Sequence, residues 1–184
     1  MILIVAGVSG SGKTTVGALL AGRLGWRFAD ADDFHPAANI AKMRAGIPLT
    51  DADRWPWLNA IAAWMDERIA RGESAVVTCS ALRRSYRDVL LAGRPEARLV
   101  FLSVDRELLE RRLAARHGHF FPRLLLDSQL AALEPAEPGE NAVTVTVGPA
   151  DDPAETVAAI IAVIWPGGGA PPPARLGGDR EAEA

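Results

Sequence analysis

The sequence predicts an α/β protein in which a parallel sheet lies between two layers of helices. Short apolar runs, typical of buried strands, alternate with helical stretches along residues 1–165, and this order is typical of a parallel sheet with helices on both faces. A glycine-rich stretch, residues 7–14, lies between the first apolar run and the first helical stretch. The 184 residues are enough for one domain with a substantial core.

The glycine-rich stretch reads Gly7-Val8-Ser9-Gly10-Ser11-Gly12-Lys13-Thr14 and fits the phosphate-binding P-loop pattern G-x-x-x-x-G-K-[ST]. Glycines let backbone amides approach a ligand closely, and the helix that follows adds the positive end of its dipole. Lys13 is expected at the β- and γ-phosphates, and the Thr14 hydroxyl is expected at Mg²⁺. We therefore predict a three-layer P-loop NTPase fold that binds ATP and Mg²⁺ through this loop and Thr15.

The remaining elements follow from apolar patterning and from glycine and proline stops. Five strands are predicted, which cover residues 2–6, 26–29, 74–78, 98–104 and 141–147. Helices are predicted over residues 15–24, 36–44, 55–71, 105–116 and 153–164, with two more that end near residues 91 and 133. Thr50 or Asp51 is expected to cap the helix that begins near residue 55.

Composition limits the possible partners. The net charge of −3 argues against a general nucleic-acid binder, and no apolar stretch approaches the length of a membrane span, about 20 residues. The single cysteine, Cys79, excludes an internal disulfide and fits a reducing cytoplasm. Residues 166–184 hold nine Gly or Pro among nineteen residues, so we expect a disordered tail after a kinase domain that covers residues 1–165.

An acidic cluster follows the second predicted strand, at the sheet edge where α/β proteins bind ligands. Asp30 and Asp32 alternate along this strand end, so we expect them to share a face. There, Asp30 would help to hold Mg²⁺ and Asp32 would take the proton of an attacking hydroxyl. Asp105, at the end of the fourth strand, is the other candidate for Mg²⁺, but it directly precedes a helix and is more simply an N-cap.

Basic side chains follow the acidic cluster along the chain and are candidates for substrate contacts. Arg54 would anchor a carboxylate or hydroxyl. One of the three arginines that follow the third strand, Arg83, Arg84 and Arg87, would face the site, and the other two would be solvated. His35 is either a substrate contact or a buried histidine at a helix start. For Arg54 the alternative is a surface ion pair.

A second basic stretch, residues 111–119, is interrupted by Gly118 and predicts a small helical lid over about residues 112–130. Phosphoryl transfer builds negative charge on the moving group, and a mobile arginine can neutralise that charge. We expect Arg112 to contact the nucleotide and Arg116 to act in catalysis. The alternative is an exposed, charged helix.

The P-loop sequence resembles that of the gluconokinases, a family of small P-loop kinases related to shikimate and adenylate kinases. Further blocks agree in order over about residues 1–165, namely Asp30-Ala31-Asp32 with His35-Pro36 and Asn39-Ile40-Ala41-Lys42-Met43, residues 46–54 with Pro56-Trp57-Leu58, Cys79-Ser80-Ala81-Leu82-Arg83 with Tyr86-Arg87, and Arg116-His117-Gly118-His119-Phe120 with Ser128-Gln129 and Leu133-Glu134-Pro135. The sequence departs from the family pattern at Ala31 (commonly Gly), Arg83 (usually Lys) and Leu130 (commonly aromatic).

The resemblance implies ATP-dependent phosphorylation of D-gluconate to 6-phosphogluconate, which feeds the pentose phosphate or Entner–Doudoroff routes. It also implies a homodimer, as some members of the family form. Carried over by position, it implies Asp32 at the substrate hydroxyl and Arg54 on gluconate, with Arg83 and Arg87 nearby. Either Arg112 or Arg116 would serve the lid. Two alternatives remain at this point: a kinase of another small acceptor, such as shikimate or a nucleoside monophosphate, and a nucleotide-binding module without transferase activity.

Overall fold

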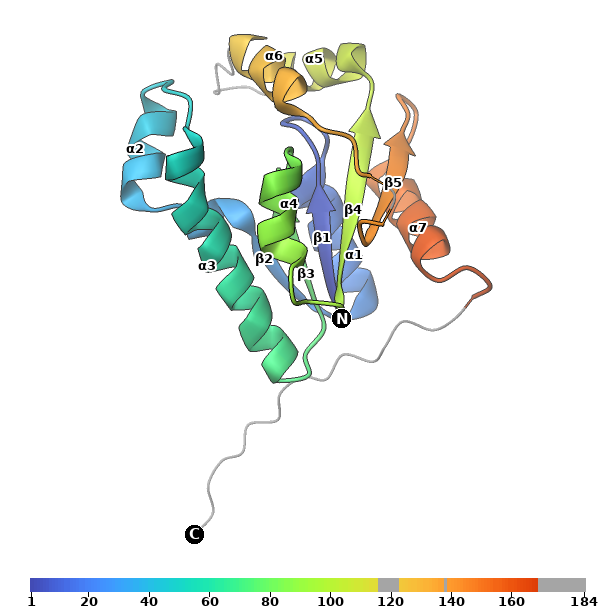
Figure 1. Cartoon of the computed structure of the whole chain (residues 1–184). Helices are drawn as coiled ribbons and strands as arrows, with labels where there is room; N and C mark the ends of the chain where they lie inside the picture. Colours follow the sequence, from blue (N-terminus) through green and yellow to red (C-terminus); the bar gives the residue numbers. More distant parts are fainter. Residues whose placement is uncertain (116–122, 138, 169–184) are drawn as a thin grey trace.

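A computed structural model describes residues 1–115, 123–137 and 139–168 of the chain. The described residues form a five-stranded sheet in which every neighbouring pair of strands is parallel. The strand order is β2-β3-β1-β4-β5 (Figure 1), with β1 at Ile2–Ala6, β2 at Arg27–Asp30, β3 at Ala75–Cys79, β4 at Ala97–Val104 and β5 at Ala142–Val147. The predicted α/β class is therefore confirmed.

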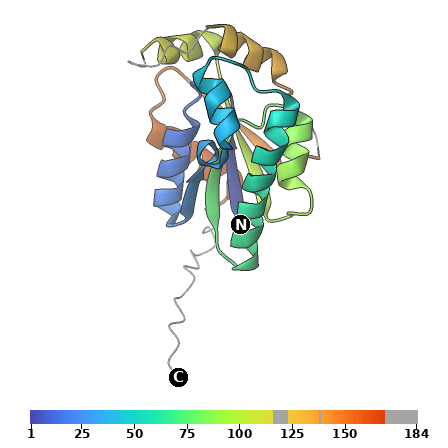
Figure 2. The same ribbon diagram turned by 90° about the vertical axis from the view of Figure 1, so that its left-hand side faces the viewer.

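Helices cover both faces of the sheet, as the view of Figure 2 shows. Alternate residues of the central strand β1 face opposite layers: Leu3 and Val5 pack in one buried cluster, and Ile2 and Ile4 in the other. The first cluster includes α1 (Lys13–Leu24) and α7 (Pro153–Ile164). The second includes α3 (Asp51–Ala70) and α4 (Arg84–Leu91). The result is the three-layer arrangement that the sequence predicts.

Three further helices lie at or beyond the carboxyl end of the sheet. They are α2 (Ala37–Arg44), α5 (Arg106–Ala114) and α6 (Arg123–Ala132). Figure 1 shows α5 and α6 across the carboxyl ends of the strands, where the predicted lid would lie. The division into a kinase domain and a lid stays a prediction. Most of the predicted tail, residues 169–184, lies outside the described residues.

Two differences from the predicted elements affect the site. A 3₁₀ helix, η1 (Ala31–Phe34), follows β2 directly and was not predicted. Helix α3 begins at Asp51, four residues before its predicted start, because Thr50 and Asp53 form a capping box. Thr50 Oγ1 accepts a hydrogen bond from Asp53 N at 3.3 Å, and Thr50 N donates one to Asp53 Oδ2 at 2.9 Å. Thr50 is thus the N-cap, one of the two predicted candidates.

Among the helices that the structure describes, none combines the length and the apolar character of a membrane span.

Candidate active site

The P-loop leaves the carboxyl end of β1 and enters α1 at a residue that supplies no side-chain cap. Gly12 is the N-cap of α1 and has a left-handed φ of 96°, so the positive end of the helix dipole faces the loop without a capping side chain in front of it. Gly7 also requires glycine, because a Cβ there would lie 2.8 Å from Ser11 Oγ and 3.0 Å from the Leu102 carbonyl oxygen. Lys13 Nζ donates to the Val8 carbonyl at 2.9 Å, which keeps its charge against the loop.

Thr14 and Asp30 place two oxygen ligands side by side at the start of α1. The Thr14 hydroxyl donates to Asp30 Oδ2 at 2.7 Å, so the end of β2 and the P-loop meet at this point. Mg²⁺ is usually held by one or two protein oxygens, with water and phosphate oxygens as the remaining ligands. The pair fits Mg²⁺ beside a bound nucleotide in this way. Within the described ranges, no cluster of three or more His, Cys, Asp or Glu residues offers an all-protein metal site.

Asp32 lies next to Asp30, although not for the reason that the sequence suggested. We expected strand alternation to bring the two carboxylates to one face. That expectation was wrong, because β2 ends at Asp30 and Asp32 belongs to η1. Asp30 instead caps η1, and its Oδ1 accepts from Asp32 N at 3.1 Å. Partial burial, followed by the charge of Asp30, raises the pKa of Asp32, against smaller opposing effects of His35 and Lys13. A carboxylate of raised basicity suits a proton acceptor.

Asp105 was the other candidate for Mg²⁺. It stands at the N-cap of α5, as predicted, but its side chain makes no capping hydrogen bond. The carboxylate that hydrogen-bonds to the P-loop threonine is Asp30, which keeps it the better candidate.

His35 follows η1 and is held flat against an indole ring. Its ring centroid lies 4.4 Å from that of Trp57, and the two planes are only 10° apart. The Trp57 Nε1–H donates to the Ala31 carbonyl at 2.7 Å, which fixes the indole in turn. Burial is the largest effect on His35 and lowers its pKa. The charge of Asp32 raises this pKa and the charge of Arg54 lowers it, and the net shift is downward. His35 is therefore a neutral group between the acidic and the basic parts of the site.

A basic cluster at the start of α3 and α4 is built around Asp51. Arg83 Nη1 donates to Asp51 Oδ2 at 2.7 Å, and Tyr86 Oη donates to Asp51 Oδ1 at 2.6 Å. Arg54 donates to the Leu49 carbonyl at 2.6 Å and lies 3.7 Å from Asp51 Oδ1. Two guanidinium groups share one carboxylate, so the cluster keeps an excess positive charge that suits one further carboxylate.

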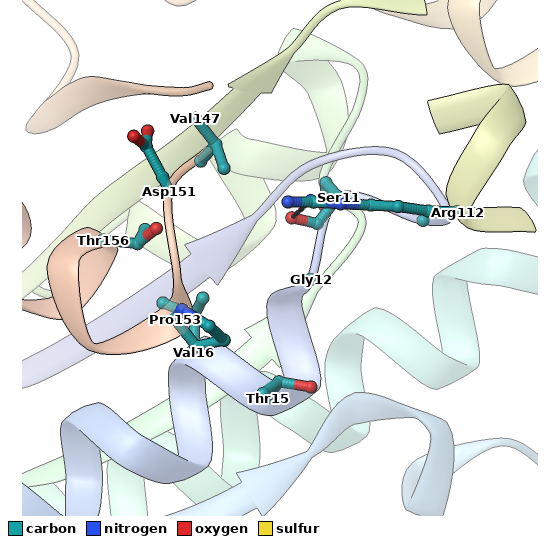
Figure 3. A pocket seen from close by; sticks show the side chains of 10 residues that line it. Ser11, Gly12, Thr15, Val16, Arg112, Val147, Asp151, Pro153 and Thr156 are labelled. Atoms are coloured by element: carbon teal, nitrogen blue, oxygen red, sulfur yellow. Dashed lines mark hydrogen bonds between the residues drawn. The ribbon is translucent and has the colours of Figure 1, made fainter. Parts of the chain in front are cut away.

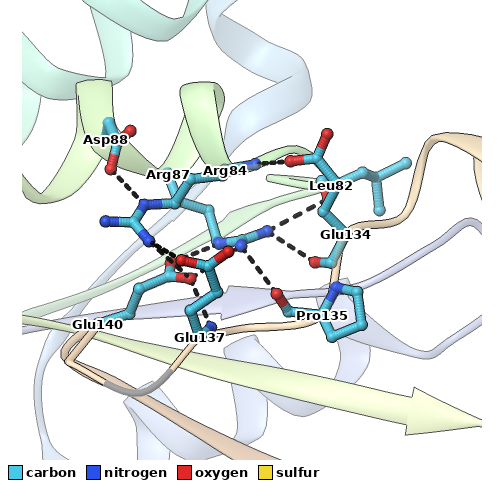
Figure 4. Close-up of polar contacts among 8 residues, drawn as sticks. All are labelled: Leu82, Arg84, Arg87, Asp88, Glu134, Pro135, Glu137 and Glu140. Carbon is cyan, nitrogen blue, oxygen red and sulfur yellow. Dashed lines mark hydrogen bonds and ion pairs between the residues drawn. The ribbon is translucent and has the colours of Figure 1, made fainter.

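Arg87 does not belong to this cluster, which corrects the expectation that it contacts substrate. Its side chain is 1% exposed and pairs with Glu140, which is 2% exposed, at 2.6 Å (Figure 4). Its remaining N–H groups donate to backbone carbonyls of Leu82, Glu134 and Pro135 and to the second Glu140 oxygen. All five donors are therefore used inside the protein, and the role of Arg87 is to join α4 to the segment between α6 and β5.

On the other side of the P-loop, Arg112 borders a pocket of about 260 Å³ (Figure 3). Its Nη1 donates to the Ser11 carbonyl at 3.4 Å, so α5 lies over the loop. The pocket lies beside the predicted phosphate cradle and is lined by Gly10, Ser11, Gly12, Thr15, Val16, Arg112, Val147, Asp151, Pro153 and Thr156. Arg116, the predicted catalytic arginine, lies outside the described residues.

Sequence reasoning gave no role in the site to three contributors to these surroundings. Asp51 was considered as a helix cap and as part of the resemblance, and Tyr86 and Gln129 only as parts of the resemblance. Gln129 of α6 contacts the P-loop at both ends of its amide: it accepts from Ser9 N at 2.7 Å and donates to Ser9 Oγ at 3.0 Å. A polar residue 120 positions away from its partner carries no local signal in the sequence.

Comparisons with known proteins agree with this geometry. The profile of the AAA domain family matches residues 2–136. A gluconokinase of Gluconobacter oxydans is 49% identical over 145 residues, which cover 79% of this chain and 80% of the relative. The chain belongs to the gluconokinase family. The crystal structure of a gluconokinase from Sinorhizobium meliloti covers 87% of this chain and 89% of its own, with 46% identity and a TM-score of 0.76.

More distant structures share only the fold with this gluconokinase family member. Shikimate kinase from Bacteroides thetaiotaomicron is 19% identical, with a TM-score of 0.61 over 89% of this chain and 98% of its own. The fold is therefore common to both groups.

Proposed function

We propose that this protein is an ATP-dependent gluconokinase that transfers the γ-phosphoryl group of ATP to the primary hydroxyl of D-gluconate, forming 6-phosphogluconate and ADP. One observation carries the proposal. The carboxylate of Asp32, the proposed proton acceptor, lies beside the Thr14–Asp30 pair of the phosphate site. Its neighbour His35 lies between Asp32 and the cluster that contains Arg54 and Arg83. The gluconokinases that are 42–49% identical to this chain support the same acceptor.

In this reaction the hydroxyl oxygen of gluconate forms a bond to the γ-phosphorus as the bond from that phosphorus to the β,γ-bridging oxygen breaks. Asp32 accepts the hydroxyl proton, or orients the hydroxyl until the proton leaves. Lys13 offsets charge on the β- and γ-phosphate oxygens, and Arg54 with Arg83 holds the carboxylate end of gluconate. Mg²⁺, when bound at Thr14 and Asp30, supplies further charge neutralisation. Arg112 contacts the nucleotide from the lid, and Arg116 is the second candidate for the arginine that offsets charge on the transferred phosphoryl group.

We also propose that the enzyme acts in the cytoplasm as a homodimer. The family resemblance supports the dimer, and the single, buried cysteine fits a reducing compartment. Light scattering of the purified protein measures the oligomeric state directly. A monomer mass at working concentration would remove the dimer from the proposal and leave the reaction untouched.

The activity is tested by ADP release with ATP and Mg²⁺, in parallel with gluconate, shikimate, glycerate and AMP. We expect gluconate alone to stimulate turnover, and 6-phosphogluconate dehydrogenase to oxidise the product. Turnover with another acceptor would overturn the substrate and keep the kinase. ATP binding without any phosphorylated product would favour the nucleotide-binding module.

A further inference from the structure

Asn39 is a buried polar side chain that no step of the proposed reaction uses. It lies on α2, is 3% exposed, and places one nitrogen between two acceptors. Its Nδ2 donates to the Asp53 carbonyl oxygen at 2.8 Å and lies 3.3 Å from Nδ1 of His35. A buried amide with this geometry restricts what its neighbours can do, because each of its hydrogens needs an acceptor.

The contact with Asp53 fixes the orientation of the amide. A backbone carbonyl oxygen only accepts hydrogen bonds, so the Asn39 atom that faces it must be the NH₂ nitrogen and not the oxygen. The same NH₂ group also faces His35, and its second hydrogen is directed to Nδ1. A nitrogen that accepts a hydrogen bond must carry its lone pair, so Nδ1 is unprotonated. In a neutral imidazole the ring proton must then be on Nε2.

The surroundings of the ring keep this proton available to a ligand. His35 is stacked on Trp57, so the ring is held in one plane. Its Nε2 makes no hydrogen bond to any residue in the part of the chain that the structure describes. Burial lowers the pKa of His35, which favours the neutral ring at physiological pH. The charges of Asp32 and Arg54 both act on this ring, so the ring lies between the acidic and the basic parts of the acceptor site.

We propose that Asn39 is a positioning residue that holds His35 as the neutral Nε2–H tautomer, so that His35 donates one hydrogen bond from Nε2 to an oxygen of the acceptor substrate. The opposite tautomer would present a lone pair at the same place and would repel a carboxylate or a hydroxyl lone pair. The substrate half of this inference rests on the proposed function. The tautomer half rests only on the Asn39, Asp53 and His35 geometry.

The tautomer is measured by ¹⁵N NMR of the full chain at a pH above the pKa of His35. The sequence contains only three histidines, and His35→Gln assigns the His35 signals by their loss. We expect an unprotonated Nδ1 and a protonated Nε2 in the wild type. In Asn39→Asp the carboxylate can only accept, so we expect a proton on Nδ1. A wild-type Nδ1 that is protonated or exchanges between both forms, or an Asn39→Asp spectrum like that of the wild type, overturns the role of Asn39. If Asn39→Asp does not fold, Asn39→Ala tests the same point through loss of the single tautomer.

A matched pair of variants tests whether Nε2–H of His35 donates a hydrogen bond to the substrate. The amide nitrogen of glutamine reaches about as far as Nε2, whereas that of asparagine reaches only about as far as Nδ1. We therefore expect the KM for gluconate to be about 2- to 10-fold higher in His35→Asn than in His35→Gln, the usual effect of one lost hydrogen bond. Equal KM values in the two variants overturn the donor role. If gluconate is not the acceptor, the substrate panel fails while the NMR result stands, so the two failures are distinguishable.

Discussion

At the scale of single residues, Asp32 lies beside the phosphate site, and partial burial, followed by the charge of Asp30, raises the pKa of its carboxylate. Replacing it with asparagine keeps the shape and the backbone contact to Asp30 but removes the proton acceptor. We expect Asp32→Asn to lower kcat by about 10²- to 10⁴-fold, the usual contribution of general base catalysis. Steady-state assays measure kcat, and calorimetric titration measures the affinity for ATP, which we expect to stay unchanged.

Asp33 provides the matched control for this prediction. It carries the same side chain one position further along η1 and, like Asp32, is exposed, but it does not cap or hydrogen-bond to the Thr14–Asp30 pair in the described contacts. We expect Asp33→Asn to keep nearly full turnover. A kcat within a few-fold of the wild type for Asp32→Asn would exclude Asp32 as the proton acceptor, and an equal loss in both variants would point to a general effect of charge.

Residue roles were only partly predictable from the sequence. The P-loop residues and Asp30 follow from a pattern whose chemistry is local, so the structure places them where the pattern requires. Arg83 and Arg87 are four positions apart and look equivalent in the sequence. Only the fold separates them, because Glu140, more than 50 residues away along the chain, buries one and leaves the other to pair with Asp51.

At the scale of elements, the Arg87–Glu140 pair joins α4 to the connection between α6 and β5 (Figure 4). Both side chains are almost fully buried, so removing one leaves an uncompensated charge inside the protein. We expect Arg87→Ala to lower the free energy of unfolding by about 3–5 kcal/mol. The nearby Arg84 is the comparison: its side chain is 42% exposed and hydrogen-bonds to the exposed Asp88 and Glu137, and Glu140 is further away at 3.6 Å. We therefore expect Arg84→Ala to lower the free energy of unfolding far less than Arg87→Ala does. Urea unfolding measures both.

The pH dependence gives this prediction a second readout. Hydrogen bonds from Arg87 lower the pKa of Glu140 in the folded state. The contribution of the pair is therefore complete above the ordinary carboxyl pKa and is lost as the pH falls through the lowered value. We expect the difference in unfolding free energy between the wild type and Arg87→Ala to narrow in acid. A difference that is small at neutral pH or constant with pH would contradict the buried ion pair.

The order and type of the regular elements were predictable, whereas the junctions between them were not. Strand β1 and helix α7 have the predicted bounds, because a fully apolar run and a proline start with an acidic cap are strong local signals. The 3₁₀ helix η1 has only four residues and is capped by the Asp30 side chain. It is too short to show an apolar periodicity in the sequence, so it could not be predicted. This junction nevertheless sets the position of Asp32 and His35.

At the scale of the whole molecule, the sheet order brings two half-sites to the same end of the protein. The nucleotide side uses β1, α1 and Arg112, whereas the acceptor side uses the ends of β2 and β3 with Arg54 and Arg83. The sequence predicted this shared edge from the parallel sheet, in which all carboxyl ends meet. It did not predict which long-range contacts hold the edge together, such as Gln129 on Ser9, since these depend on the packed structure.

Because the two half-sites are built from different elements, each ligand should stabilise the fold on its own. A ligand at 100 times its Kd adds about 2.7 kcal/mol to the free energy of unfolding. We expect ATP with Mg²⁺ and gluconate each to raise Tm in thermal unfolding of the wild type. Lys13→Met should lose the shift from ATP and keep that from gluconate, and Arg54→Gln should do the reverse. A gluconate shift that survives Arg54→Gln would place the substrate carboxylate elsewhere, and loss of both shifts in either variant would show that the half-sites form one cooperative unit.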